Sequence, residues 1–151
     1  MRLVIQRVTE ACVSVRGRIV SAIGPGAVIL LGVAKGDTSH DALYLARKAS
    51  QLRIFDDHEG KMNLPIDSVK GAFLVVSQFT LFGDCSKGNR PSYIEAAAPE
   101  DAQAMYELFA RHLQTLGHEV KMGVFRENMT VNLANQGPVT LILESAGRQS
   151  D

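Results

Sequence analysis

The stretch Ala72–Phe82 has the sequence AFLVVSQFTLF, and the rest of the chain is interpreted relative to it. Its first five residues are all apolar, which is typical of a strand that is covered on both faces. Small polar side chains begin at Ser77, and Gly83-Asp84 ends the run. A buried strand that ends in small polar residues exposes backbone amides and hydroxyl groups at the edge of a sheet. The sequence therefore predicts a binding pocket beside Ser77–Phe82.

A second stretch, Asn135–Thr140, has the sequence NQGPVT and is the counterpart of the first near the other end of the chain. Its Gly137-Pro138 pair has two interpretations. The first is an ordinary turn, because only about 5–6% of X-Pro bonds in folded proteins are cis. In the second interpretation the bond is cis, so the flanking carbonyl groups point the same way. The motif would then form a rigid wall that excludes side chains of the wrong chirality. Glycine also lets the backbone approach a ligand closely. The sequence alone leaves both open.

Composition indicates one globular domain over residues 1–151. Sixteen basic and sixteen acidic residues give no net charge, which argues against a protein that coats long nucleic acid, since such binding neutralises many phosphates. A protein that grips only the end of an RNA remains compatible with this balance. Cys12 and Cys85 are far apart in the sequence, which suggests free thiols in a reducing cytoplasm rather than a disulfide framework. The first residues contain no long apolar segment, so we expect no membrane anchor.

The periodicities predict an α/β chain of the α+β type, strand-rich, with at least two helices packed on the sheet. One helix begins after Thr38, with Asp41 placed to complete a capping box. A second begins at Pro99, which suits the first helical position. The expected strands are a hairpin from Leu3 to Ile23, a buried strand over 27–33, the strand from Ala72, and two C-terminal strands, 129–134 and 139–144, separated by a sharp interruption.

Ser77 and Thr80 are the candidate side-chain nucleophiles, and each would need a base within hydrogen-bond reach. None of the four histidines lies in a recognisable motif, and structural hydroxyl groups are the better interpretation. No Cys-x-x-Cys or His-x-x-x-His spacing exists, so we expect no metal. The glycine-rich nucleotide and P-loop patterns are also absent, and no cofactor is expected.

With these motifs in place, the sequence resembles the D-aminoacyl-tRNA deacylase family over essentially its whole length. The segments that carry the resemblance are Met1–Val8, Leu52–Phe55, Gly60–Asn63, Ser77–Leu81, Lys87–Ser92 and Asn135–Thr140. The resemblance implies hydrolysis of the ester between a D-amino acid and the 3′ end of tRNA, a proofreading step in translation. It also implies a homodimer whose active sites lie at the interface. Glycyl-tRNA is expected to be cleaved too, because glycine has no side chain to collide with a chiral wall.

The resemblance assigns roles to particular residues. Ser77 and Gln78 of one subunit, with Gly137 and Pro138 of the other, would bind the substrate, and the Gly-Pro bond would be cis. The backbone amides of Phe79 and Thr80 would stabilise the oxyanion, while the 2′-hydroxyl of the terminal ribose helps to activate water. Arg7 would hold the Gly-Pro motif in place.

One segment departs from the family pattern. Phe125–Asn128 replaces the small glycine and alanine residues that are usual there, which bears on tRNA preference if this segment lines the interface or the tRNA entrance. Four basic residues could together contact phosphates, although scattered surface charge is the better interpretation of any single one: Lys61, Lys87, Arg90 and Arg126. Two alternatives to the deacylase remain open, an esterase with a threonine nucleophile and an RNA-binding dimer without catalytic activity.

Overall fold

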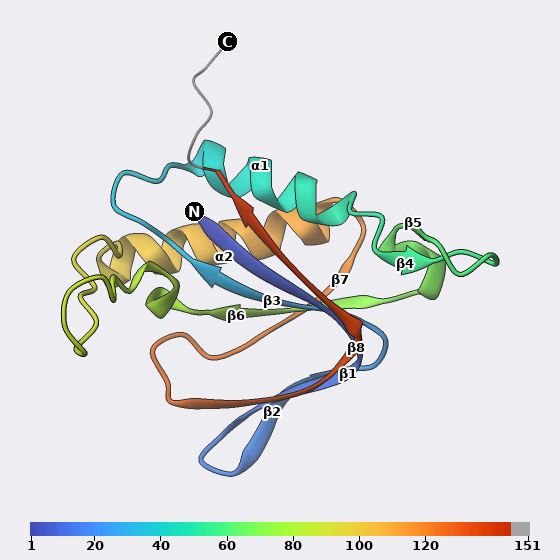
Figure 1. Ribbon diagram of the computed structural model, residues 1–151, viewed down its shortest axis with the longest axis horizontal. Helices are drawn as coiled ribbons and strands as arrows, with labels where there is room; N and C mark the ends of the chain where they lie inside the picture. The colour runs from blue at the N-terminus through green and yellow to red at the C-terminus, as the bar shows by residue number, and fades with distance from the viewer. Residues whose placement is uncertain (146–151) are drawn as a thin grey trace.

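The computed structural model describes residues 1–145, and Figure 1 shows two helices above a strongly curved sheet. The helices are α1 (Ser39–Ser50) and α2 (Pro99–Thr115), and two short 3-10 helices are η1 (Ile66–Val69) and η2 (Phe79–Phe82). The strands are β1 (Arg2–Val15), β2 (Arg18–Ile23), β3 (Gly26–Gly32), β4 (Phe55–Asp56), β5 (Met62–Leu64), β6 (Ala72–Ser77), β7 (Glu119–Met122) and β8 (Met129–Glu144). This arrangement confirms the predicted fold class.

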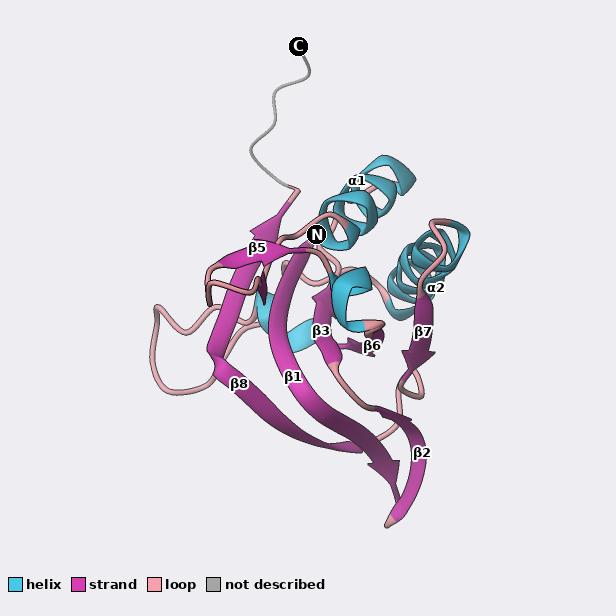
Figure 2. Ribbon diagram, turned by 90° about the vertical axis from the view of Figure 1, so that its right-hand side faces the viewer, coloured by secondary structure: helices cyan, strands magenta, loops and turns pink. Residues whose placement is uncertain are grey.

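The main sheet is mixed and is organised around the long strand β1. One edge of β1 pairs with β8 along its whole length, and the other pairs first with β3 and then with β2, all antiparallel. Beyond β3, the strands β6 and β7 follow in parallel orientation. In Figure 2 β1 and β8 lie side by side and curve together as part of the sheet. The Ser21 hydroxyl on β2 donates to the carbonyl of Met122 on β7, so the curl brings β2 back to the far side of the sheet.

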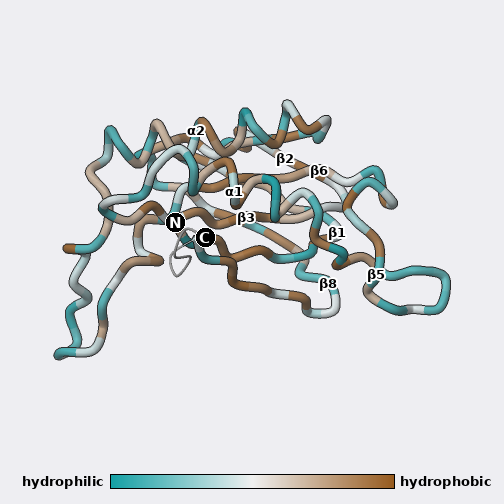
Figure 3. Tube along the Cα trace, turned by 90° about the horizontal axis from the view of Figure 1, so that it is seen from above, coloured by the Kyte–Doolittle hydropathy of each residue, from teal (hydrophilic) through white to brown (hydrophobic). Residues whose placement is uncertain are grey.

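Both faces of the central strands are buried, as the apolar runs predict. Ile29 and Val75 point into the core beneath α1 and α2, whereas Val28 and Leu74 point into a second, smaller cluster enclosed by the curled half of the sheet. Figure 3 shows this as brown, hydrophobic segments along β3, with hydrophilic residues on the β4–β5 hairpin. A strand covered on both faces needs a continuous apolar sequence rather than an alternating one.

Both helices begin where the sequence predicts. The Thr38 amide donates to the Asp41 carboxylate at 2.8 Å, which closes the predicted capping box at the start of α1. Pro99 is the first residue of α2, followed by Glu100 and Asp101 in the first turn, where acidic side chains suit the positive end of the helix dipole. No helix among residues 1–145 is long and apolar enough to cross a membrane.

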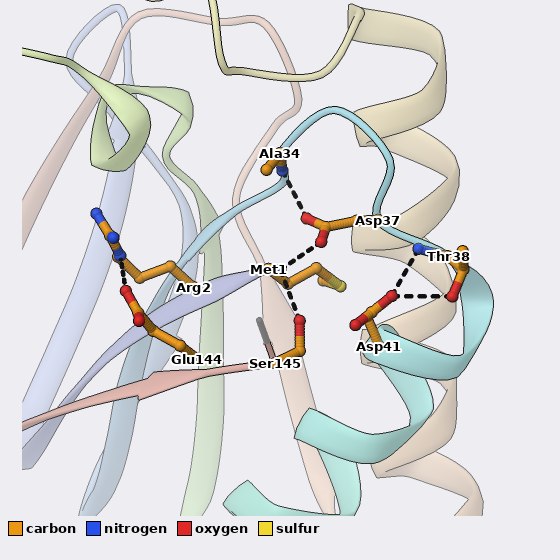
Figure 4. Close-up of polar contacts among 8 residues, drawn as sticks. All are labelled: Met1, Arg2, Ala34, Asp37, Thr38, Asp41, Glu144 and Ser145. Carbon is orange, nitrogen blue, oxygen red and sulfur yellow. Dashed lines mark hydrogen bonds and ion pairs between the residues drawn. The ribbon is translucent and has the colours of Figure 1, made fainter. Parts of the chain in front are cut away.

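Met1, immediately before β1, ties three segments together at one end of the sheet (Figure 4). Its ammonium group donates to Asp37 Oδ1 at 2.6 Å and to the Ser145 hydroxyl at 2.7 Å. The other Asp37 oxygen accepts from the Ala34 amide at 2.6 Å. The Met1 side chain is itself buried, so its charge is paired inside the protein rather than in solvent.

The prediction of two separate C-terminal strands is wrong. Met129–Glu144 is a single strand, β8, that stays paired with β1 on both sides of the Gly-Pro motif. The interruption is a bulge, because Gln6 pairs with Thr140 and Val8 pairs with Asn135, which leaves residues 136–139 opposite Arg7 alone. The pairing resumes because apolar residues on each side of the bulge pack against a core cluster, Val139 and Leu143 against the larger one and Val131 and Leu133 against the smaller one. The strand β7 has no counterpart among the predicted strands.

Candidate active site

A pocket of about 620 Å³ lies at the carboxyl end of β6, where the sequence predicts one. Its walls include Ser77–Phe79, the start of α2 at Pro99 and Ala102, and the β7–β8 turn at Phe125–Met129. This volume falls in the range of pockets that hold ligands of nucleoside size.

The Ser77–Thr80 segment differs from the expected strand end. The strand β6 stops at Ser77, and Phe79–Phe82 forms the 3-10 helix η2. Close packing on β3 sets this turn, because the Gln78 amide donates to the Leu31 carbonyl at 2.8 Å and a side chain at Gly32 would lie 3.1 Å from the Gln78 carbonyl oxygen. Phe79 and Thr80 are the first residues of η2, and the N–H groups at the start of a helix have no partner within it. Backbone amides are therefore available at the predicted place.

The side chains of Phe79 and Thr80, at the start of η2, are exposed, and each contacts a neighbouring side chain. The Thr80 side chain is exposed, and its hydroxyl accepts a hydrogen bond from the Gln78 side-chain amide. Phe79 is 54% exposed and packs edge-on against Tyr93, with ring centroids 5.1 Å apart, at the pocket wall. Arg2 supports the turn from outside by donating to the Leu81 carbonyl at 2.7 Å, a contact that sequence reasoning missed.

The second motif is held by Arg7, a charged side chain that is only 5% exposed. Its Nε donates to the carbonyl of Gln136 at 3.2 Å, and its Nη1 donates to the Ile54 carbonyl at 2.8 Å and to Asp56 Oδ1 at 3.0 Å. The Gly137-Pro138 bond is cis, and Gly137 has a φ of +120°. A Cβ on Gly137 would lie 2.8 Å from Val139 Cγ2 and 3.1 Å from the Arg7 guanidinium, so this position requires glycine.

Asn135 is the residue of this motif whose local role sequence reasoning missed. Its side-chain amide donates to the backbone carbonyl of Arg7 at 3.0 Å and to that of Val139 at 2.9 Å. These two bonds close the base of the bulge across β1 and β8, where the regular strand pairing is lost. The only sequence signal was the position of an asparagine just before Gln-Gly-Pro, where short amide side chains often bond to nearby backbone.

The two motifs do not meet within one chain. Gly137 and Pro138 are both exposed, and neither lines the pocket beside Ser77–Phe79. Gly137 instead lies on the other side of β1, on an edge strand beside the β4–β5 hairpin. The pocket and the Gly-Pro motif can therefore form one site only if the motif comes from a second copy of the chain.

Ionisable side chains are scarce in the pocket. No histidine lines it, and within residues 1–145 no cluster of three or more histidine, cysteine or acidic side chains could hold a metal ion. Tyr106 on α2 is not a lining residue of the pocket; burial raises the pKa of its phenol, and its hydroxyl donates to the Val75 carbonyl at 2.9 Å. The described lining residues thus offer backbone amides and hydroxyl groups here, with Glu127 as the one carboxylate among them.

The fold and the pocket define a class of α+β proteins with a pocket at the end of a central strand. The sequence model of the D-Tyr-tRNA(Tyr) deacylase family matches residues 4–144. The chain belongs to this family, which confirms the predicted resemblance and the expectation of a hydrolase. Proteins named D-aminoacyl-tRNA deacylase are 54% identical over 145 residues in Desulforamulus reducens and 55% identical in Desulfatibacillum aliphaticivorans. Each alignment covers 96% of this chain and 97% or 99% of the relative.

Solved structures agree with the fold. A structure named "c-Myc DNA Unwinding Element Binding Protein" is 39% identical, with a TM-score of 0.90, and the alignment covers 96% of this chain and 99% of the other. A second structure, described as "a probable eukaryotic D-amino acid tRNA deacylase", has a TM-score of 0.78 at 16% identity. Its alignment covers 95% of this chain and 98% of the other. At that identity the second comparison supports the fold alone.

Proposed function

We propose that this protein hydrolyses the ester bond of D-aminoacyl-tRNA and releases free tRNA and the D-amino acid. The observation that carries the proposal is the pocket at Ser77–Phe79. The chain that forms it is more than half identical, over nearly its whole length, to proteins named for this activity. The reaction would take place in the cytoplasm, where aminoacyl-tRNA is used.

In the proposed mechanism, water attacks the ester carbonyl and a negative charge develops on its oxygen. The backbone amides of Phe79 and Thr80 stabilise that charge, a contribution of about 3–4 kcal/mol for one donor in comparable sites. The terminal 2′-hydroxyl of the tRNA helps to activate the water. This division of roles is supported by the lack of histidine among the described lining residues of the pocket and by the hydrogen bond that engages the Thr80 hydroxyl.

Each active site would be shared between two subunits. One subunit supplies the pocket with Ser77 and Gln78, and its partner supplies Gly137 and Pro138. Two features support this homodimer: the Gly-Pro motif is exposed on an edge strand, and apolar Ile142 on that strand is 65% exposed. An edge strand that carries exposed apolar residues is a surface suited to pairing with another chain.

A mixed-dimer experiment tests the shared site. Gly137→Ala disables the motif, and Ser77→Phe fills the pocket, so each variant alone should be inactive. A mixed dimer of the two contains one site with an intact pocket and an intact motif, and it should therefore recover activity. A mixture refolded together that stays inactive, although mass spectrometry detects mixed dimers, would refute the shared site.

The Gly137-Pro138 wall would select the D-configuration by colliding with the side chain of an L-amino acid. Glycine carries no side chain, so glycyl-tRNA should also be cleaved when no other factor protects it. Complete resistance of free glycyl-tRNA would count against steric exclusion as the filter.

The direct test of the activity uses purified protein and D-tyrosyl-tRNA. We expect release of the amino acid at a rate well above spontaneous hydrolysis. A second function, nucleic-acid binding without hydrolysis, is favoured by the 39% identical solved structure, which is named as a DNA-binding protein. That alternative predicts retention of tRNA on a filter with no release of amino acid, and this outcome would replace the proposal.

A further inference from the structure

The formal charges in the pocket lining belong to one short segment, the turn between β7 and β8. Among the described lining residues, Arg126 and Glu127 are the charged ones, and the remainder are apolar or neutral polar side chains. They line the same pocket as Ser77–Phe79, so its lining combines neutral amides and hydroxyls with one segment that carries charge.

The positive charge on this segment is not balanced by its neighbour. Glu127 Oε2 lies 3.7 Å from a guanidinium nitrogen of Arg16 in the β1–β2 hairpin, so its negative charge is partly neutralised. The Arg126 side chain is exposed and forms no ion pair or hydrogen bond with any side chain or backbone group in residues 1–145. Its guanidinium is therefore available to an anion at the pocket.

The turn that carries Arg126 is fixed relative to β6. The Glu127 amide donates to the Val124 carbonyl at 3.3 Å, and the Phe125 ring lies 5.9 Å from that of Tyr106. The Tyr106 hydroxyl in turn donates to the carbonyl of Val75, two residues before Ser77. A group bound by this turn is consequently held at a fixed position relative to the end of β6. Positioning of a substrate requires such a fixed geometry.

We infer that Arg126 binds the phosphodiester on the 5′ side of the terminal nucleoside of the substrate. This inference rests on the proposed function, because an ester at the 3′ end of tRNA has that phosphodiester as its nearest fixed negative charge. A guanidinium recognises phosphate oxygens with two parallel N–H donors. Arg126 then orients the terminal nucleoside across the pocket and presents the ester to Ser77–Phe79. It is a positioning residue and does not touch the reacting atoms.

The test compares substrates that differ only in phosphate. Three substrates are assayed: D-tyrosyl-tRNA, 3′-O-D-tyrosyl-AMP, which carries a 5′-phosphate, and 3′-O-D-tyrosyl-adenosine, which lacks it. Each is incubated with the full-length wild type, with Arg126→Ala and with Arg111→Ala. Arg111 is an exposed arginine on α2 that does not line the pocket, so it controls for general charge. A third variant, Glu127→Gln, removes the competing negative charge while keeping the side-chain shape.

For Arg126→Ala we expect KM to rise about three- to tenfold on the two phosphate-bearing substrates, with kcat nearly unchanged. The adenosine substrate should be unaffected, and Glu127→Gln should lower KM for tRNA. The dependence of log KM on log salt should become shallower by about 0.7 for one lost single-strand phosphate contact.

Two results would overturn the inference. One is an equal loss on all three substrates, and the other is a loss of the same size in Arg111→Ala. Wild type that cleaves none of the substrates would instead refute the proposed function. Thermal melting of each variant checks that folding is unchanged, as expected for Arg126, whose side chain forms no ion pair or hydrogen bond within residues 1–145.

Discussion

The buried guanidinium of Arg7 on β1 donates to the backbone carbonyl of Gln136, the residue that precedes the Gly-Pro motif on β8. The same side chain reaches Ile54 and Asp56 on the other side, so one residue joins the bulge to the β4–β5 hairpin. The motif is therefore held by a charged group from the strand opposite it. A hydrogen bond from a charged group is stronger than a neutral one and suits a segment that has lost its regular strand pairing.

Arg7→Ala should lower the free energy of unfolding by about 2–4 kcal/mol, because the buried Ile54 carbonyl, the partly buried Gln136 carbonyl and the Asp56 carboxylate lose their donor. Deacylation should fall as well, since the motif loses its support. Urea denaturation measures the stability change. Arg47→Ala, which removes an exposed arginine on α1, is the matched control and should stay within about 0.5 kcal/mol of wild type. Equal stability of the two variants would show that Arg7 does not hold the bulge.

Gly137→Ala should reduce the rate of D-tyrosyl-tRNA hydrolysis by about 100-fold or more, because the new Cβ collides with Val139 and Arg7 and displaces the motif. The positive φ adds strain of about 1–3 kcal/mol. Gly117→Ala carries a similar backbone strain, with φ at +96° and no atom within 4 Å of the added Cβ. That control should lose stability but keep its rate constant. Unchanged single-turnover kinetics in Gly137→Ala would contradict the assignment.

Thr80→Ala should keep kcat within about tenfold of wild type, since the account gives the hydroxyl a positioning role and not that of a nucleophile. Thr80→Ser, which retains the hydroxyl and removes the methyl group, serves as the control. Single-turnover hydrolysis of D-tyrosyl-tRNA provides the measurement. A loss of several orders of magnitude in the alanine variant, restored in the serine variant, would favour the threonine-nucleophile esterase instead.

Asp37→Asn should destabilise the protein by about 3–5 kcal/mol, because it leaves the buried Met1 ammonium without its anionic partner. The comparison is Glu59→Gln, which breaks an ion pair with Lys61 at a similar 2.7 Å but in an exposed turn. That change should cost less than about 1 kcal/mol. If the two substitutions have equal effects on the melting temperature, burial does not strengthen the Met1 pair.

Local patterns were sufficient to predict the central strands and the helix ends. The apolar runs of β3 and β6 and the Thr38–Asp41 capping box depend on neighbouring residues, and each is confirmed. The pocket beside Ser77 was also predicted from a local pattern, an apolar run that is followed by small polar residues at the edge of the sheet. The expected path of the chain after Ser77 was wrong, because the chain turns into η2 at Phe79, next to a bond from the Gln78 amide to the Leu31 carbonyl on a different strand.

Features that depend on pairing across the sheet were beyond local patterns. β8 stays continuous through a proline because β1 pairs with it on both sides of the bulge. The place of Arg126 in the pocket likewise follows from the path of β7 and from the bonds of Tyr106, which join segments far apart in the sequence. The resemblance to a known family, and not the spacing of residues, supplied the roles expected for Arg7 and Gly137.

The most direct measurement is the ratio of single-turnover rate constants for D-tyrosyl-tRNA and L-tyrosyl-tRNA with the wild-type protein. A pocket closed by the Gly137-Pro138 wall of a partner subunit predicts that the D-substrate is cleaved at least about 100-fold faster, because the L side chain collides with backbone that cannot yield. Equal rates on the two substrates, or hydrolysis of neither, would contradict the account.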